Sequence, residues 1–172
     1  KLLEQAEITF GKDKSLMRNL ALLNLQVGNR EKGWEFYSKI KHEDRVSLDR
    51  NPHTEAIKQL EIDDLKSLKK LATKKKNHVL VYFEQGIGDY IMFSRYLNML
   101  SDHGFKVTAF GQKDVVEMFN NSNQFKKIKF ESTLYPDDFK KFNYKTFIQD
   151  LPFLLMDKDI PEPTKFDKKV II

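Results

Sequence analysis

The sequence predicts an α/β fold with a parallel sheet and helices on both of its faces, preceded by an α-helical hairpin. Two observations lead to this prediction. From residue 78 onward, short runs of β-branched and aromatic residues alternate with segments of helical periodicity in the order β-α-β-α-β. Before residue 44, two stretches of helical periodicity are separated by the pair Gly28-Asn29. Alternating strands and helices form parallel sheets, which bind ligands beyond the carboxyl ends of their strands.

The composition suits a soluble protein with one ordinary domain and a smaller appendage. The chain has 172 residues, of which 40% are hydrophobic and 32% are charged, and this is enough for a packed core. No apolar run approaches the roughly 18 residues that a membrane-spanning helix needs, so we expect no transmembrane segment and a cytoplasmic location. The chain has no cysteine, which excludes disulfides, thiolate metal sites and cysteine nucleophiles. It starts at Lys1 without a leader, so we expect it to be part of a longer protein.

The net charge of +5 suits an anionic partner, but the distribution of the charges is better explained by a helix end that faces solvent. Much of the excess lies in the lysine-rich stretch 66–76, which is typical of a solvated helix end. The phenylalanines fall at helix and strand periodicities that indicate core packing rather than a stacking platform for bases. We therefore expect no nucleic-acid partner.

The first 44 residues predict paired helices. Residues 15–27 carry an apolar stripe, Gly28-Asn29 supplies a turn, and residues 30–41 carry a second stripe that includes Trp34 and Tyr37. The stretch NLALLNLQVGNREKGWEFYSKI resembles a tetratricopeptide repeat, with Ala21, Gly28, Gly33 and Tyr37 at the positions that this repeat favours. Residues 2–10 resemble the closing helix of a preceding unit. Because roughly three stacked repeats are needed for independent stability, we expect residues 1–44 to be either a remnant of a longer array, which can bind a protein partner, or a support for the next domain.

Residues 45–77 are expected to form a connector that is partly helical. Asn51-Pro52 marks a turn, and a charged amphipathic helix is indicated by apolar residues at helical spacing: Ile62, Leu65, Leu68 and Leu71. Residues 78–172 are assigned to the α/β domain. Its strands are predicted at 78–83, 105–110, 126–130 and 144–149, and its helices at 89–103, at 113–120 and, briefly, from Leu151-Pro152. Pro161 and Pro163 predict an extended exit toward a further strand at 169–172.

The loop from Glu84 to Asp89 joins the first strand of this domain to its first helix. Glycines allow backbone N–H groups to approach a ligand, and the helix N-terminus adds partial positive charge. The loop is neither a dinucleotide fingerprint, since Ile91 replaces the third glycine, nor a P-loop, since no Lys-Ser/Thr pair follows. Asp89 has two compatible roles: it caps the helix, and at the carboxyl end of a strand it acts as a base toward a hydroxyl or orients it.

The stretch VLVYFEQGIGDYIMFSRYLNMLSDHGFKVTAF resembles the start of the glycosyltransferase-like domain that follows tetratricopeptide repeats in many bacterial proteins. It is also similar, more distantly, to heptosyltransferases, which are GT-B enzymes of two Rossmann-like domains. The resemblance implies that residues 78–172 form the Rossmann-like acceptor-side half, with Asp89 as catalytic base and Gln85, Gly86, Ile87 and Gly88 in contact with a sugar or glycan acceptor. A nucleotide-sugar donor is implied for the complete protein, with no cofactor held by this chain alone, which is expected to be inactive by itself.

Two residues depart from the family pattern: Asn143 stands where an Asp is usual, and Asp150 where a Ser is usual. The tryptophan-rich approach of the family to the first strand is also missing, and all three differences concern the acceptor. The competing interpretation is a non-catalytic interaction module built on the helical repeats. Other residues give weaker signals. The four histidines have neither paired metal-ligand spacing nor a common helical face, so no metal site is expected. Arg95 is expected at the surface or in packing rather than on a phosphate.

Overall fold

The computed structural model describes residues 5, 13–44, 54, 57–60, 65–74, 77–83 and 86–155. Several sequence predictions lie outside these residues: the helix at 2–10, the turn at Asn51-Pro52, the loop residues Glu84 and Gln85, the extended exit at Pro161 and Pro163, and the strand at 169–172. Within the described residues, no helix is long and apolar enough to cross a membrane.

The described part of the chain is built on a five-stranded sheet in the order β1-β5-β2-β3-β4. Every neighbouring pair is parallel, which confirms the predicted α/β class. The strands are β1 (Lys58–Gln59), β2 (His78–Tyr82), β3 (Lys106–Phe110), β4 (Ile128–Glu131) and β5 (Tyr144–Phe147). Strand β1 lies in the segment predicted as a connector. Its two residues pair with β5, which is distant in the sequence, so no local pattern indicated this strand.

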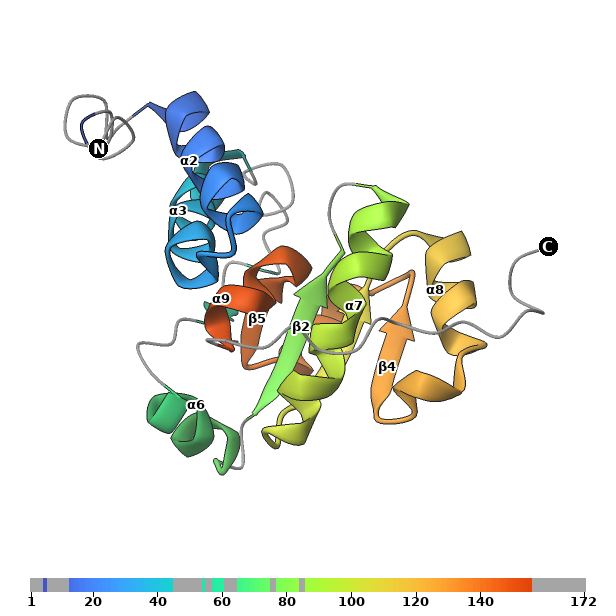
Figure 1. Cartoon of the computed structure of the whole chain (residues 1–172). Coiled ribbons are helices and arrows are strands. Elements are labelled where there is room, and N and C mark those ends of the chain that lie inside the picture. Colours follow the sequence, from blue (N-terminus) through green and yellow to red (C-terminus); the bar gives the residue numbers. More distant parts are fainter. Residues whose placement is uncertain are drawn as a thin grey trace.

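The first face of the sheet is covered by α-helices. Alternate strand residues form one buried cluster with helices α6 (Leu65–Ala72), α7 (Ile87–Asp102) and α8 (Lys113–Asn120). The strand residues of this cluster are Val79, Val81, Val107, Ala109, Ile128 and Phe130. Figure 1 shows α7 crossing in front of β2, with α8 beside β4. Strand β2 is buried on this face and on the other, which explains why it reads as a short apolar run in the sequence.

The second face is covered by a shorter element, the 3₁₀ helix η2 (Pro136–Lys141) between β4 and β5. Phe139 and Phe142 from this segment pack with Leu80, Tyr82 and Phe147 of the sheet. Helices therefore lie on both faces, as predicted. The crossover itself was not predicted, because a 3₁₀ turn of six residues is too short to leave a helical stripe in the sequence.

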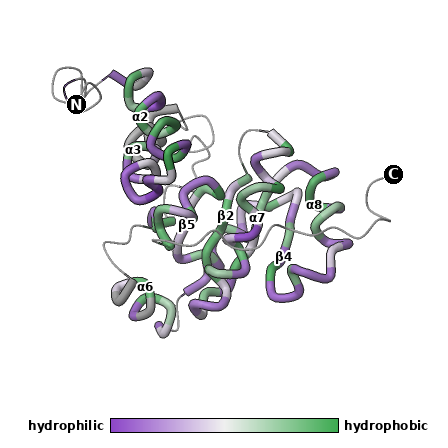
Figure 2. Tube along the Cα trace, in the orientation of Figure 1, coloured by the Kyte–Doolittle hydropathy of each residue, from purple (hydrophilic) through white to green (hydrophobic). Residues whose placement is uncertain are grey.

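The amino-terminal segment forms a helical hairpin of α2 (Lys14–Gln26) and α3 (Arg30–Asp44). The carboxylate of Asp13 caps α2 by accepting the Leu16 N–H at 3.0 Å. Gly28 has a φ of 84°, which permits the tight turn at the predicted position. At Gly33 an added Cβ would lie 2.7 Å from Leu25 Cγ, so the glycine lets the helices approach closely. Figure 2 shows hydrophobic and hydrophilic residues alternating along both helices. The hairpin is thus confirmed, whereas its tetratricopeptide assignment stays a prediction.

Four element boundaries differ from the predicted ones by two or more residues; one is the end of α3, at Asp44 instead of Lys41. Helix α7 begins at Ile87 instead of Asp89 because Gly86, in extended conformation, is the N-cap. Strand β4 begins at Ile128 instead of Lys126 because a short 3₁₀ helix, η1 (Asn123–Phe125), capped by Ser122, occupies the preceding residues. Strand β5 ends at Phe147, and the chain turns through η3 (Ile148–Asp150) into α9 (Leu151–Leu154). Helix α7 ends at Asp102, one residue before the predicted end, and Gly104, with a φ of 101°, follows its C-cap His103.

Candidate functional site

The candidate site lies at the carboxyl edge of the sheet, where β2 leads into α7. Strand β2 is flanked by β3 on one side and by β5 on the other. The crossover from β2 runs over the first face, and the chain enters β5 from η2 on the second face. The chain runs outward from β2 through β3 to β4 and then returns to β5 on the other side of β2, so the strand order reverses between β2 and β5. Such a topological switch point is the usual binding position in open α/β sheets. The loop at residues 86–89 is located at this switch point.

The described part of the predicted substrate-binding loop is exposed. Gly86, Ile87 and Gly88 all face solvent, and the Ile87 side chain is 53% exposed. Because Ile87 and Gly88 belong to the first turn of α7, their N–H groups have no acceptor inside the helix. These amides are therefore donors available to a ligand. Gln85, which we predicted beside them, lies outside the described residues.

Asp89 is the third residue of α7 and is half-buried. Its Oδ2 accepts the backbone N–H of Gly86 at 3.3 Å. This bond ties the N-cap residue to the first helical turn, which is the capping role predicted for Asp89. A carboxylate has about four lone-pair sites, so one such bond leaves acceptor capacity on Asp89.

The loop combines a carboxylate with backbone donors in a single helical turn. The amide dipoles of the 16-residue helix α7 favour negative charge at its N-terminus, and the carboxylate of Asp89 already supplies such a charge. A second anion would be repelled by Asp89, whereas a hydroxyl would donate to the carboxylate and accept from an amide. The local chemistry therefore fits a hydroxyl-bearing ligand better than a free phosphate.

Gly111 shapes the neighbouring part of the edge, just after β3. An added Cβ at this position would lie 2.9 Å from Cβ of the buried Phe83. The Gly111 N–H donates to the Glu131 carbonyl at 3.1 Å, and the Phe83 N–H donates to the Phe110 carbonyl at 2.8 Å. These bonds extend the ladder beyond the strand ends and hold three strand ends together. Gly111 was not among the predicted site residues, although a glycine directly after a predicted strand was a usable signal.

The opposite side of the switch point is formed by the segment after β5. Gln149 is fully buried there, and its Oε1 accepts a hydrogen bond from the Tyr37 hydroxyl at 2.5 Å. Helix α7 contacts both η3 and α9. Asp150, one of the departures from the family pattern, is buried and stands at the N-cap of α9. Gln149 was not predicted as part of the site, because its partner is distant in the sequence.

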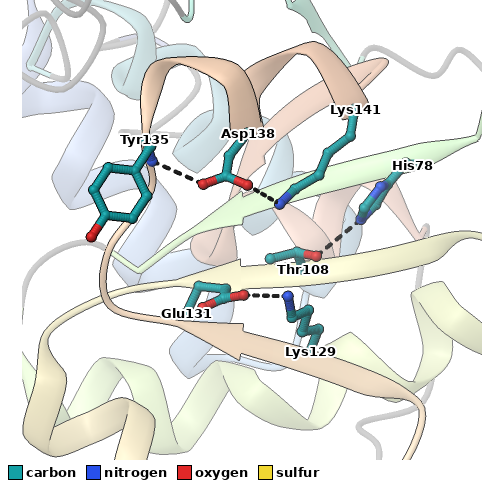
Figure 3. Close-up of polar contacts among 7 residues, drawn as sticks. All are labelled: His78, Thr108, Lys129, Glu131, Tyr135, Asp138 and Lys141. Atoms are coloured by element: carbon teal, nitrogen blue, oxygen red, sulfur yellow. Dashed lines mark hydrogen bonds and ion pairs between the residues drawn. The ribbon is translucent and has the colours of Figure 1, made fainter.

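The second face of the sheet carries a polar cluster below η2 (Figure 3). Nε2 of the buried His78 lies 2.9 Å from the Thr108 hydroxyl. Burial, followed by the charges of Lys106, Lys141 and Lys129, lowers the pKa of His78 to about 4. The ring is therefore neutral at pH 7. Because this pair is enclosed, it serves the packing of η2 rather than substrate binding.

Asn143, the other departure from the family pattern, clamps the start of β2. Its Oδ1 accepts the His78 N–H at 3.2 Å, and its own N–H donates to the His78 carbonyl at 2.9 Å. Nε of Arg95 donates to the Met92 carbonyl at 2.8 Å, which agrees with the predicted local role. Among the described residues, no group of three His, Asp or Glu side chains is arranged to hold a metal ion.

Comparisons with protein-family models, with curated proteins and with solved structures return no match to this chain.

Proposed function

We propose that this chain is the acceptor-side α/β unit of a glycosyltransferase that uses a nucleotide-sugar donor. The observation that carries the proposal is the position of Asp89. Its carboxylate lies in the first turn of α7, at the carboxyl edge and beside a topological switch point. The similarity of residues 79–110 to the glycosyltransferase-like domains described above supports the same function. The acceptor is a sugar or glycan whose hydroxyl group binds at the loop.

In this proposal Asp89 acts as the general base. The acceptor hydroxyl donates its hydrogen bond to the carboxylate, and the N–H groups of Ile87 and Gly88 bind neighbouring oxygens of the same sugar. The hydroxyl oxygen forms a bond with the anomeric carbon of the donor while the bond from that carbon to the phosphate breaks. The proton moves to Asp89, and the nucleotide leaves with the electron pair. The nucleotide-sugar site is assigned to a second α/β domain of the complete protein.

Sugar transfer by the complete protein tests the proposal, with UDP-, GDP- and ADP-linked sugars as donors and mono- and oligosaccharides as acceptors. Replacing Asp89 by Asn or Ala removes the base and is expected to lower kcat by about 10²- to 10⁴-fold. The matched control is Asp114→Asn. Asp114 is an exposed carboxylate in the first turn of α8 at the same sheet edge, and its loss should leave the rate unchanged. A folded Asp89→Ala protein that transfers sugar at the wild-type rate would refute the catalytic assignment.

A second function, a non-catalytic interaction module, is favoured by a different observation. Helix α2 exposes Leu22 (52%) and Leu23 (40%), and the following turn exposes Val27 (78%). Exposed apolar side chains on one helix of a hairpin are what a stacked repeat or a partner protein would cover. The reading frame after Ile172 separates the two functions: a second α/β domain supports the enzyme, and a stop codon supports the module.

A further inference from the structure

A continuous chain of side-chain contacts connects the helical hairpin to both sides of the candidate site. On α3, the Trp34 ring meets the Tyr37 ring edge-on at 5.7 Å between centroids. The same tryptophan meets Phe93 of α7 edge-on at 5.9 Å. The Tyr37 hydroxyl then donates to Oε1 of Gln149 at 2.5 Å. One helix of the hairpin thus contacts α7 through a ring and the end of β5 through a hydrogen bond.

These contacts reach α7 one turn from Asp89. Phe93 and Asp89 are four residues apart on the helix, so their side chains share one side of it. Phe93 is buried, and its contact with Trp34 limits how the amino end of α7 can shift or rotate. Trp34 itself packs on the central core of the sheet. The orientation of the first turn of α7 therefore depends partly on a side chain from the hairpin.

The same hairpin fixes the other side of the switch point. Gln149 follows β5, and β5 is hydrogen-bonded to β2, whose end leads into the loop. Gln149 is fully buried, and burying an amide oxygen without a hydrogen bond is costly, so the bond that Oε1 accepts from Tyr37 offsets part of that cost. The bond from Tyr37 holds the Gln149 side chain in one orientation. The segment from Ile148 to Asp150, which contacts α7, is held with it.

We propose that Tyr37 and Gln149 are positioning residues for the candidate site: through their hydrogen bond, the docked hairpin sets the geometry of the Asp89 loop. The proposal rests on the proposed function in one respect, namely that this loop is the site. It assigns the hairpin a role inside the domain, in addition to any partner that the hairpin binds. Neither residue touches the substrate. Both act through α7 and the end of β5.

The test compares Tyr37→Phe with wild type by amide hydrogen exchange, without any sugar. Three amides report on the loop: Gly86 N–H, bonded to the Asp89 carboxylate, and the N–H groups of Asp89 and Tyr90, bonded to the Gly86 carbonyl. Removing one hydroxyl deletes a single hydrogen bond and retains the ring. We expect exchange at the three amides to accelerate about two- to tenfold, the range set by the net effect of one hydrogen bond. Fluorescence of Trp34, the one tryptophan of the chain, verifies that the hairpin stays docked.

Tyr135→Phe is the matched control, since it is the same substitution at a side chain that is 69% exposed. It should leave exchange at the loop unchanged. Gln149→Met removes the acceptor of the same hydrogen bond. The double variant Tyr37→Phe/Gln149→Met should accelerate exchange at the loop amides no more than either single variant does. Equal loop exchange in Tyr37→Phe, Tyr135→Phe and wild type would overturn the proposal. Because no substrate is used, a failed transfer assay and a failed exchange comparison remain separate results.

Discussion

Nε2 of His78 lies 2.9 Å from the hydroxyl oxygen of Thr108, between β2 and β3 and beneath η2. The ring also makes a hydrogen bond with the backbone of Lys141, and this bond raises the pKa of His78. A bond that raises the pKa favours the protonated ring, so the ring N–H is the donor and the Lys141 carbonyl is the acceptor. The Thr108 hydroxyl accordingly donates to Nε2. Both ring nitrogens of a neutral imidazole are then satisfied, and protonation would require the Thr108 hydroxyl to rotate and accept from Nε2–H instead. The crossover to β5 is thus held by a histidine whose ring is neutral at pH 7.

The stability of the domain should fall in mild acid because of His78. Its folded-state pKa of about 4 lies below the unfolded value of 6.5, so the unfolded chain binds the proton more readily. The stabilisation is complete above pH 6.5 and is lost as the pH falls toward 4. Linkage gives a loss of about 2–3 kcal/mol by pH 4.5. Urea unfolding at pH 7 and pH 4.5 measures it.

The controls for this prediction are two histidine variants. In His78→Gln the extra loss at pH 4.5 should disappear, even if the protein is less stable at pH 7. In His103→Gln, at the C-terminus of α7, the loss should persist. The same loss of unfolding free energy between pH 7 and pH 4.5 in wild type, His78→Gln and His103→Gln would show that other groups control the acid sensitivity.

Removing a neighbouring lysine should raise the pKa of His78. Burial is the largest cause of the lowered pKa, and the charge of Lys106 is the next largest. Lys106→Gln is therefore expected to raise the pKa of His78. Lys113→Gln, an exposed lysine on α8, serves as the control and should leave the pKa unchanged. Imidazole chemical shifts followed by NMR over pH 3–8 provide the measurement. A pKa that is identical in Lys106→Gln and wild type would contradict the electrostatic explanation.

Gly111→Ala should destabilise the carboxyl edge of the sheet. The new methyl group would lie 2.9 Å from Cβ of Phe83, and a Cβ atom cannot move without its backbone. Overpacking of this kind costs about 1–3 kcal/mol. Gly88→Ala is the comparison, since an added Cβ there meets nothing within 4 Å, and alanine in a helix gains up to about 1 kcal/mol over glycine. Thermal or urea unfolding of both variants should therefore give effects of opposite sign.

Phe119 is expected to be one of the most important side chains for stability. It is fully buried, stacks on Phe130 at 5.1 Å and meets Phe83 and Phe125 edge-on. Phe119→Ala should reduce the free energy of unfolding by about 3–5 kcal/mol. Met92→Ala, at a side chain that is 47% exposed, should stay within about 0.5 kcal/mol of wild type. Comparable losses in the two variants would mean that the aromatic cluster is not the centre of the core.

Local patterns in the sequence were sufficient for most elements. Helix α8 has the predicted bounds, and α2 and β2 each lie within a residue of theirs. Their signals come from nearby residues: apolar periodicity, the glycines at 28 and 104, and the strand composition of residues 78–83.

Tertiary structure decided what no local pattern encodes. The pairing of Lys58–Gln59 with β5, the bond from Tyr37 to Gln149 and the approach of Gly111 to Phe83 each join segments that are distant in the sequence. The sequence determined that a glycine-acid turn follows the first strand of an α/β unit, and that Asp89 caps the helix there. Only the folded chain places that turn at a switch point between β2 and β5 and packs the hairpin against Phe93 of α7. Strand order and docking depend on which buried surfaces fit together rather than on any one segment.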